Sequence, residues 1–173
     1  MFKLNSIIVA ALLIGGTIFT NSCSEDATNP TPQEFIADDN TFSNFMSWKL
    51  EATNKGADPS LGMAHAGNDE TVTREIYIKD GQDRVNGKFP VGTLVVKHSK
   101  NTAGTVNEFT AMVKRGNNFN PAANDWEWFM LSPDGKIMVG ENNMPVRGAN
   151  LMDGMCVGCH AGASTKDYVF SKK

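Results

Sequence analysis

The stretch Gly92–His98, GTLVVKH, decides the fold class of this chain. It is short and rich in β-branched residues, and Pro90 lies just before it, a combination that is typical of a β-strand. Three other stretches have the same character and similar Gly, Pro or Asp boundaries: Arg74–Lys79 (REIYIK), Asn107–Lys114 (NEFTAMVK) and Trp126–Leu131 (WEWFML). The centre of the chain is therefore predicted to form a β-sheet.

Turn signals join these strands as hairpins. Ser132–Gly135 (SPDG) has Pro to preset φ, Asp to bond its own backbone and Gly for a left-handed position. A further strand, Lys136–Val139, is expected to complete that hairpin, and Lys100–Thr105 (KNTAGT) is a second predicted turn. Short turns between neighbouring strands indicate an antiparallel sheet.

Helical patterns are scarce. Asn40–Leu50 has apolar residues at helical spacing after a group of capping residues, which predicts one N-terminal helix. A second short helical segment is expected around residues 155–160. The predicted fold is therefore mostly β (α+β class), an antiparallel β-sheet with an N-terminal helix and a C-terminal segment, and a four-helix bundle is excluded.

The C-terminal segment contains Met155–His160, MCVGCH, which is the C-x-x-C-H motif of c-type haem attachment. The spacing predicts that Cys156 and Cys159 form thioether bonds to one haem c and that His160 is the proximal ligand of its iron. A thioredoxin-type pair would need a parallel βαβ unit, which does not precede the motif. Structural zinc would need four ligands, and only two other histidines, which we expect on the surface or in loops, are present: His65 and His98.

The position of the motif limits the second axial ligand. Only 13 residues follow His160, and none of them is Met or His, so a downstream ligand is excluded. An upstream methionine remains an alternative, the candidates being Met112, Met130 and Met152. We favour the interpretation that these methionines fill space against a large flat ligand.

The N-terminus is typical of an exported protein. Met1–Ser22 resembles a signal peptide, because its apolar run of 13 residues, Ile7–Phe19, is shorter than the roughly 20 that span a bilayer. Cys23 follows at the position of the lipidated cysteine of bacterial lipoproteins, the alternative being an ordinary secretory signal that leaves Cys23 free or removes it. These features divide the chain into a signal peptide (1–22), a lipidated flexible tether (23–38) and a haem domain (39–173).

The predicted location follows from the lipid. We expect a periplasmic or outer-membrane lipoprotein of a Gram-negative bacterium, attached to the membrane by its lipid anchor only. The acidic residues Glu25 and Asp26 just after the cysteine are typical of lipoproteins sent to the cell surface. Cys23 for lipid and two cysteines for haem account for all three cysteines, so no disulfide is predicted.

Composition and charge exclude several classes of protein. The 173 residues are 40% hydrophobic and 20% charged, which is ordinary for one globular domain and excludes a disordered or coiled-coil chain. The formal net charge is −3 and no run of Lys or Arg is present. Nucleic acid is therefore not an expected partner.

Several separate blocks together resemble the cytochrome P-460 family, which includes the β-type cytochromes c-prime. The order and spacing of the blocks agree from about Phe42 to Phe170; they are Arg74–Ile78, Phe89–Lys97, Asp125–Phe129, Cys156–His160 and Lys166–Phe170. The resemblance implies a mono-haem, mostly β protein that is typically a homodimer. Members named for the pigment oxidise hydroxylamine and carry a haem cross-linked to a lysine, whereas β-type cytochromes c-prime lack the cross-link and bind nitric oxide.

The resemblance also implies roles for individual residues. Lys97 stands where the family has its cross-linking lysine, although by itself it is typical of a strand-end lysine with its ammonium group in water. Arg74 matches an arginine beside the haem pocket, with an edge-strand arginine as the alternative. Thr110 aligns with a glutamate that takes protons from the substrate. Glu108, on the same strand face, is the candidate to replace it, the alternative being an alignment shifted by two positions in which Glu108 is itself the matching glutamate.

Three functions are compatible with these residues. The first is hydroxylamine oxidation with electrons passed to a redox partner cytochrome, and in this enzyme the candidate catalytic residues are Lys97, Arg74 and Glu108. The second is binding or scavenging of nitric oxide without turnover. The third is plain electron transfer, which needs a sixth ligand from an upstream Met or Lys.

Overall fold

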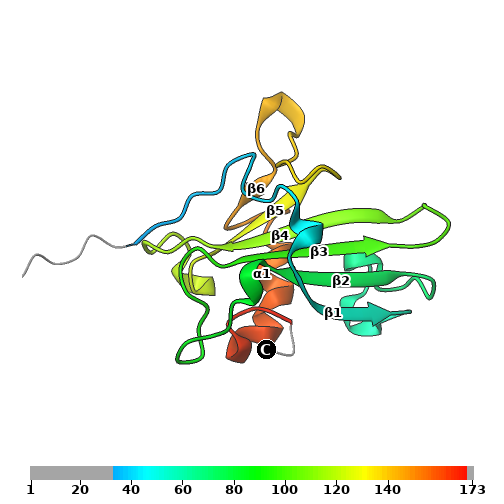
Figure 1. Cartoon of the computed structure of the whole chain (residues 1–173), viewed down its shortest axis with the longest axis horizontal. Coiled ribbons are helices and arrows are strands. Elements are labelled where there is room, and N and C mark those ends of the chain that lie inside the picture. Colours follow the sequence, from blue (N-terminus) through cyan, green and yellow to red (C-terminus); the bar gives the residue numbers. More distant parts are fainter. Residues whose placement is uncertain (1–32, 171–173) are drawn as a thin grey trace, which may run out of the picture.

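A computed structural model describes residues 33–170, and one antiparallel β-sheet forms its centre (Figure 1). The six strands lie side by side in the order in which they occur in the chain, β1-β2-β3-β4-β5-β6. Their bounds are β1 Lys49–Lys55, β2 Thr73–Ile78, β3 Leu94–Lys100, β4 Asn107–Lys114, β5 Trp126–Leu131 and β6 Arg147–Gly148. The four central strands predicted from the sequence, and the mostly β class, are thereby confirmed.

One α-helix accompanies the sheet in the described residues. It is α1, Met155–His160, which confirms the helical segment expected at the C-x-x-C-H motif. The remaining helical elements are short 3-10 helices: Phe45–Ser47, Pro59–Leu61, Ala64–Ala66, Lys79–Gly81, Pro121–Ala123, Glu141–Asn143 and Ala161–Lys166.

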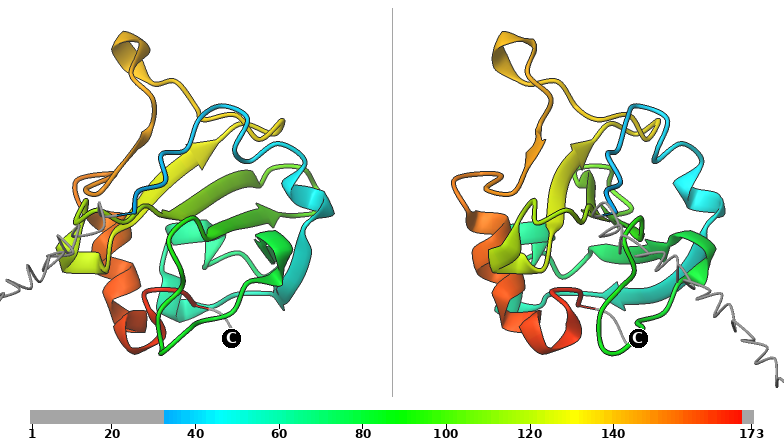
Figure 2. Two further views of the ribbon diagram at one scale, coloured as in Figure 1. Left: turned by 60° about the vertical axis from the view of Figure 1, so that its left-hand side comes forward. Right: turned by 90° about the vertical axis from the view of Figure 1, so that its left-hand side faces the viewer.

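Strand alternation gives the sheet two different apolar faces. On one face, Tyr77, Val96, Phe109 and Phe129 belong to a core that also includes Phe42 and Phe45 from the N-terminal segment. On the other, the core consists mainly of sheet residues together with parts of the C-terminal segment: Ile76, Ile78, Phe89, Val95, Met112, Ala123, Trp126, Trp128 and Val169. The sheet therefore lies between the N-terminal and C-terminal segments, as Figure 2 shows.

The N-terminal helix predicted over Asn40–Leu50 is wrong. This segment forms successive turns and the single 3-10 helix Phe45–Ser47, and β1 begins at Lys49. Phe42 and Phe45 are buried against the sheet, while Met46 and Leu50 are about half exposed. Only two of the four apolar residues that suggested a helix are therefore buried. The last two residues of the predicted helix belong instead to the edge strand β1.

The hairpin after β5 is shorter than predicted. The turn Ser132–Gly135 is present, with the amide of Gly135 donating to the carbonyl of Ser132 at 2.9 Å and Gly135 at φ +80°. The expected strand Lys136–Val139 is reduced to isolated bridges, Leu131 with Ile137 and Val139 with Pro145. The chain then projects from the body of the molecule before it returns as β6 (Figure 1).

A buried ion-pair network ties the N-terminal segment to β5 and β6. Glu127 is 2% exposed, and Arg147 donates to its carboxylate from Nε at 2.7 Å and from Nη2 at 2.9 Å. Arg115 adds a longer contact of 3.4 Å, and Nη1 of Arg147 donates to the carbonyl of Ala37. Ala37 is itself buried, so the folded part begins before the predicted boundary at residue 39.

The predicted signal peptide and Cys23 lie outside the described residues. Within residues 33–170, no helix is long and apolar enough to cross a membrane.

Candidate functional site

Helix α1 brings both cysteines and the histidine of the C-x-x-C-H motif to one cavity. Cys159 and His160 lie three and four positions after Cys156, which places both of them next to Cys156 on one surface of the helix. All three line a cavity of about 410 Å³ between α1 and the sheet. Neither cysteine is in a disulfide, and burial raises the pKa of the Cys156 thiol.

His160 is held in one tautomer. Its side chain is buried, and Nδ1 donates to the backbone carbonyl of Tyr168 over 2.7 Å. Burial lowers the pKa of His160 to about 4, so the imidazole is neutral at physiological pH. With its proton on Nδ1, the ring has its lone pair on Nε2, the arrangement that metal-binding histidines require.

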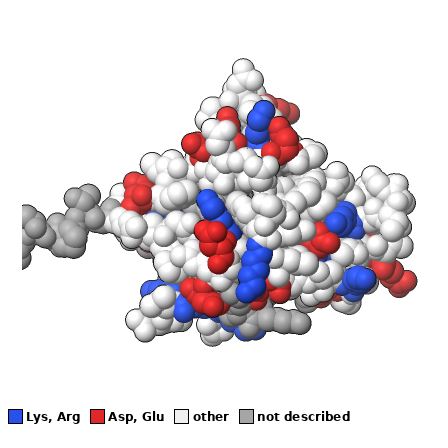
Figure 3. Space-filling view, in the orientation of Figure 1, with Lys and Arg blue, Asp and Glu red and all other residues white. Residues whose placement is uncertain are grey.

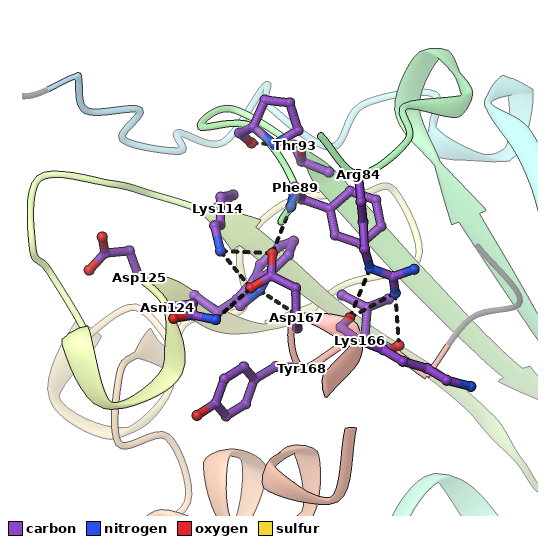
Figure 4. A network of polar contacts seen from close by, with 12 residues as sticks. Arg84, Phe89, Thr93, Lys114, Asn124, Asp125, Lys166, Asp167 and Tyr168 are labelled. Carbon is purple, nitrogen blue, oxygen red and sulfur yellow. Dashed lines mark hydrogen bonds and ion pairs between the residues drawn. The ribbon is translucent and has the colours of Figure 1, made fainter. Parts of the chain in front are cut away.

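Tyr168, whose carbonyl accepts the hydrogen bond from His160, comes directly after Asp167 in the sequence, and Asp167 has a buried carboxylate (Figure 4). Asp167 is 1% exposed and accepts hydrogen bonds from Lys114 at 2.8 and 2.9 Å, from Asn124 at 2.9 Å and from the amide of Phe89 at 2.7 Å. Its own carbonyl accepts from Nε1 of Trp126 at 2.7 Å. The C-terminal segment is thus fixed to β4 and β5 one residue from the carbonyl that orients His160.

The rest of the cavity wall suits a large flat apolar ligand. It consists mainly of apolar side chains from the sheet and the C-terminal segment: Ile76, Val95, Met112, Trp128, Leu151, Val169 and Phe170. Nε1 of Trp128 is buried and has no hydrogen-bond partner within the described residues. Two thiols, a neutral imidazole and an apolar wall with one unsatisfied donor together fit a haem attached through this motif.

Lys97 lies on the cavity-facing side of β3. It shares that face with Val95, as the alternation predicted, and it pairs across the sheet with Thr110 of β4. The side chain is half-buried, and burial lowers the pKa of Lys97 to about 8, with Arg74 adding to the lowering and Glu108 opposing it. Lys97 therefore lies at the cavity with a pKa well below its ordinary value, unlike the strand-end lysine with a solvated ammonium that is the alternative.

Glu108 and Thr110 line the same cavity from β4. Glu108 accepts a hydrogen bond from Nδ1 of His65 at 2.8 Å, and this bond is the main cause that lowers the pKa of Glu108. His65 also lines the cavity, with its side chain 18% exposed. The expectation of a surface or loop histidine missed this contact, because the two residues are 43 positions apart.

Arg74 lies in an adjoining cavity of about 300 Å³. The two cavities share Lys97 and Cys159 in their walls. Arg74 is 2% exposed, and its guanidinium donates to the carbonyls of Gly56 at 2.6 Å and Ala66 at 3.3 Å. Its strand, β2, is an interior strand, so the edge-strand alternative is wrong.

His98 lies on the opposite face of β3 from Lys97, as the alternation predicted. It is 6% exposed, stacks on Phe109 with ring centroids 4.2 Å apart, and donates from Nε2 to the side-chain oxygen of Asn107 at 2.8 Å. The expectation that His98 is a surface or loop residue is therefore wrong.

The three methionines weighed as axial ligands, Met112, Met130 and Met152, all line the cavity. Their position agrees equally with filling space around a ligand and with a sixth coordination bond. Among residues 33–170, no group of three or more His, Cys, Asp or Glu side chains is arranged to hold a metal ion by itself. The described part of the chain thus offers no cluster for the zinc alternative.

Comparison with known proteins gives one family. The model of that family, described as Cytochrome P-460, matches residues 42–171. No curated protein and no solved structure matches the chain significantly. The matched range includes all six strands, α1 and every residue that lines the two cavities.

Proposed function

The chain belongs to the cytochrome P-460 family, whose members bind haem, and we propose that it is a c-type haem enzyme that oxidises hydroxylamine. Electrons would pass to an external acceptor, for which a redox partner cytochrome is the proposed class. One observation carries this proposal: Lys97, the residue that matches the family's cross-linking lysine, lies in the wall of the cavity that contains Cys156, Cys159 and His160.

Different residues of the chain would attach the haem, ligate its iron and accept a proton. Cys156 and Cys159 would hold the haem through thioether bonds, and His160 would ligate the iron through Nε2. The haem, when bound, supplies an iron that accepts electrons one at a time. Glu108 lines the cavity as an ionised carboxylate, because the hydrogen bond from His65 lowers its pKa, and it is the candidate acceptor in the wall where hydroxylamine would release a proton.

Glu108 also answers the one departure from the family pattern. The aligned position is Thr110, whose hydroxyl is a poor base at its ordinary pKa. Both residues line the cavity from the same face of β4, two positions apart. A carboxylate at position 108 therefore faces the same cavity as a carboxylate at position 110 would.

Nitric oxide binding is the second candidate function, and the apolar wall favours it. A small uncharged gas needs no acid or base, and most of the cavity is lined by side chains such as Val95 and Met112. Under this alternative the haem would have no cross-link, and Lys97 would be a half-buried amine beside it. Plain electron transfer needs a sixth ligand and remains the third alternative.

A purified holoprotein distinguishes these functions. We expect hydroxylamine-dependent reduction of an artificial one-electron acceptor, together with a ferrous Soret band strongly red-shifted from that of ordinary haem c. Lys97→Arg retains a cation but not the family's lysine, so its Soret band is expected at the ordinary position, with turnover lost. Met138→Leu, at an exposed position away from the cavity, is the control that retains both properties.

Two spectra would contradict the enzyme. An ordinary five-coordinate high-spin spectrum in the unmodified protein, without turnover, identifies the nitric oxide binder. A sharp low-spin α-band identifies electron transfer. Intact mass is an independent check, because a bond between Lys97 and the haem removes hydrogens that simple haem addition retains.

The proposal includes location and assembly. Export through residues 1–22 brings the chain to the compartment where c-type haem is attached, and a lipid on Cys23 would hold it at a membrane. A homodimer is proposed from the family pattern. Acidic and basic side chains are interspersed on the face drawn in Figure 3, without a broad area of one sign. Nucleic acid is therefore not among the proposed partners.

A further inference from the structure

The contact between His65 and Glu108 assembles a histidine–carboxylate pair in the cavity wall. Nδ1 of His65 lies 2.8 Å from Oε1 of Glu108, and both side chains line the cavity that contains His160. Since a carboxylate can only accept, Nδ1 is the donor and holds the ring proton. Nε2 of His65 therefore has a lone pair and is the basic atom of the pair.

Burial keeps His65 neutral until a proton arrives. Burial is the largest cause that lowers the pKa of His65, and the Lys97 and Arg74 cations lower it further, while Glu108 raises it. The Glu108 carboxylate is stabilised as an anion by the same hydrogen bond and by Lys97. A proton accepted on Nε2 would give an imidazolium next to an existing carboxylate, which is the arrangement of a histidine base oriented by an acid.

The backbone around His65 is constrained. His65 and Ala66 both adopt left-handed conformations with φ of 52°, which non-glycine residues rarely take. The carbonyl of Ala66 accepts from Nη1 of Arg74 at 3.3 Å, so a buried side chain of β2 contacts this turn. A Cβ on Gly67 would lie 2.5 Å from Cβ of Leu61, which leaves no room for a side chain there. The turn that carries His65 is therefore held in place by Arg74 and by close packing at Gly67.

We propose that His65 is the proton acceptor of this cavity and that Glu108 orients it. An acid H–X that enters the cavity gives its proton to Nε2 of His65, whose lone pair forms the new N–H bond. The electron pair of the H–X bond stays on X, and the proton on Nδ1 stays in its bond to Glu108. The inference rests on the proposed haem site, and for hydroxylamine it assigns the first proton to His65 and not to Glu108 directly.

Cyanide association with the ferric holoprotein tests this step without hydroxylamine. Hydrogen cyanide must lose a proton to bind as cyanide, so a base in the cavity accelerates association. We expect His65→Gln to slow association by about a hundredfold or more at neutral pH, the range found for general acid–base catalysis. Glu108→Gln retains an acceptor for Nδ1 but not the charge, so it should slow association less.

The pH profile separates a base from a structural residue. In the unmodified protein the rate should fall in an acid step below pH 6.5, the ordinary pKa of histidine, because burial lowers the pKa of His65. The step should be absent in His65→Gln. The matched control is His98→Gln, which replaces a buried histidine on the opposite face of the sheet and should leave the rate and the step unchanged.

Three results would overturn the inference. If His65→Gln leaves the rate of cyanide association and its pH profile unchanged, His65 is not the proton acceptor. If His65→Gln and His98→Gln slow association equally, the effect of His65→Gln is structural. Faster association in His65→Gln, with a low-spin spectrum in the unmodified protein, would make His65 an iron ligand. Loss of haem in every preparation would instead refute the proposed haem site, and assisted cyanide binding without hydroxylamine turnover would refute only the proposed substrate.

Discussion

The Nδ1 atom of His160 and the backbone carbonyl oxygen of Tyr168 lie 2.7 Å apart, within the short segment that ends the described chain. This bond determines which nitrogen of His160 is available to the cavity. The preceding residue, Asp167, is anchored to the sheet through its side chain and its carbonyl. The orientation of the predicted iron ligand therefore depends on a buried ion pair that is not itself in the cavity wall.

Asp167→Asn is expected to destabilise the holoprotein and also to make His160 a weaker electron donor to the iron. It leaves the Lys114 ammonium, 7% exposed, without its anion, a change that costs about 3 kcal/mol or more. The reduction potential should rise, because a weaker bond at Nδ1 makes the imidazole a poorer donor to iron. Urea unfolding and a redox titration measure the two effects.

Glu127→Gln is the control for that experiment. It breaks a second buried ion pair, with Arg147, and should lower the free energy of unfolding by a similar amount. Glu127 does not line the cavity, so its variant should retain the potential of the unmodified protein. Equal potential shifts in the two variants would contradict a specific role for Asp167.

Stability should rise with pH below about pH 6.5, and variants of His65 and Glu108 should separate their parts of this rise from the part of His160, whose pKa is lowered to about 4. The pKa values of Glu108 and His65 are lowered from ordinary values of 4.5 and 6.5, so near each value the unfolded chain binds more protons than the folded one. The free energy of unfolding then increases as pH rises through each window. His65→Gln should reduce the slope just below pH 6.5, and Glu108→Gln should reduce the slope just below pH 4.5, while His160 and Glu75, whose pKa values are also lowered, retain the rest of the rise. Unfolding curves at several pH values decide this, and an unchanged slope in either variant would contradict the assignment.

Arg74→Lys should weaken the function of His65 without removing it. A lysine ammonium cannot reproduce the planar fork that donates to the carbonyls of both Gly56 and Ala66, so the turn that carries His65 should become more mobile. We expect slower cyanide association than in the unmodified protein but faster association than in His65→Gln. Lys100→Met, which removes a half-exposed ion pair with Glu75 on the other face of the sheet, is the control. An Arg74→Lys rate equal to that of this control would show that Arg74 does not position His65.

Cys23→Ser should release the exported protein from the membrane while the haem remains attached. Cys156→Ser should do the reverse, retaining the membrane fraction and weakening covalent haem attachment through the loss of one thioether. Detergent partitioning and haem staining of a denaturing gel measure both properties. Membrane retention of Cys23→Ser would disprove the lipid anchor.

The strands were predictable because their signal is local. Asn107–Lys114 and Trp126–Leu131 are predicted with their observed bounds, since a high content of aromatic and β-branched residues is a property of neighbouring positions alone. β1 was missed because it is an edge strand whose residues are mostly exposed or intermediate, which leaves little apolar alternation. The helix predicted in its place relied on Phe42 and Phe45, which are buried by a sheet far along the chain.

The site divides in the same way. The sequence by itself predicted the proposed attachment chemistry, because the C-x-x-C-H motif depends only on the local spacing of Cys156, Cys159 and His160, which lie within about one turn of a helix. Only the tertiary structure decided what faces them: the register of β3 and β4 brings Lys97, Thr110 and Glu108 to one wall. It also brings His65, from a strained turn, into contact with Glu108 across 43 positions of chain. No local sequence pattern can predict such a contact. It depends on the register of the strands in the sheet and on the path of the connection between β1 and β2, which carries His65.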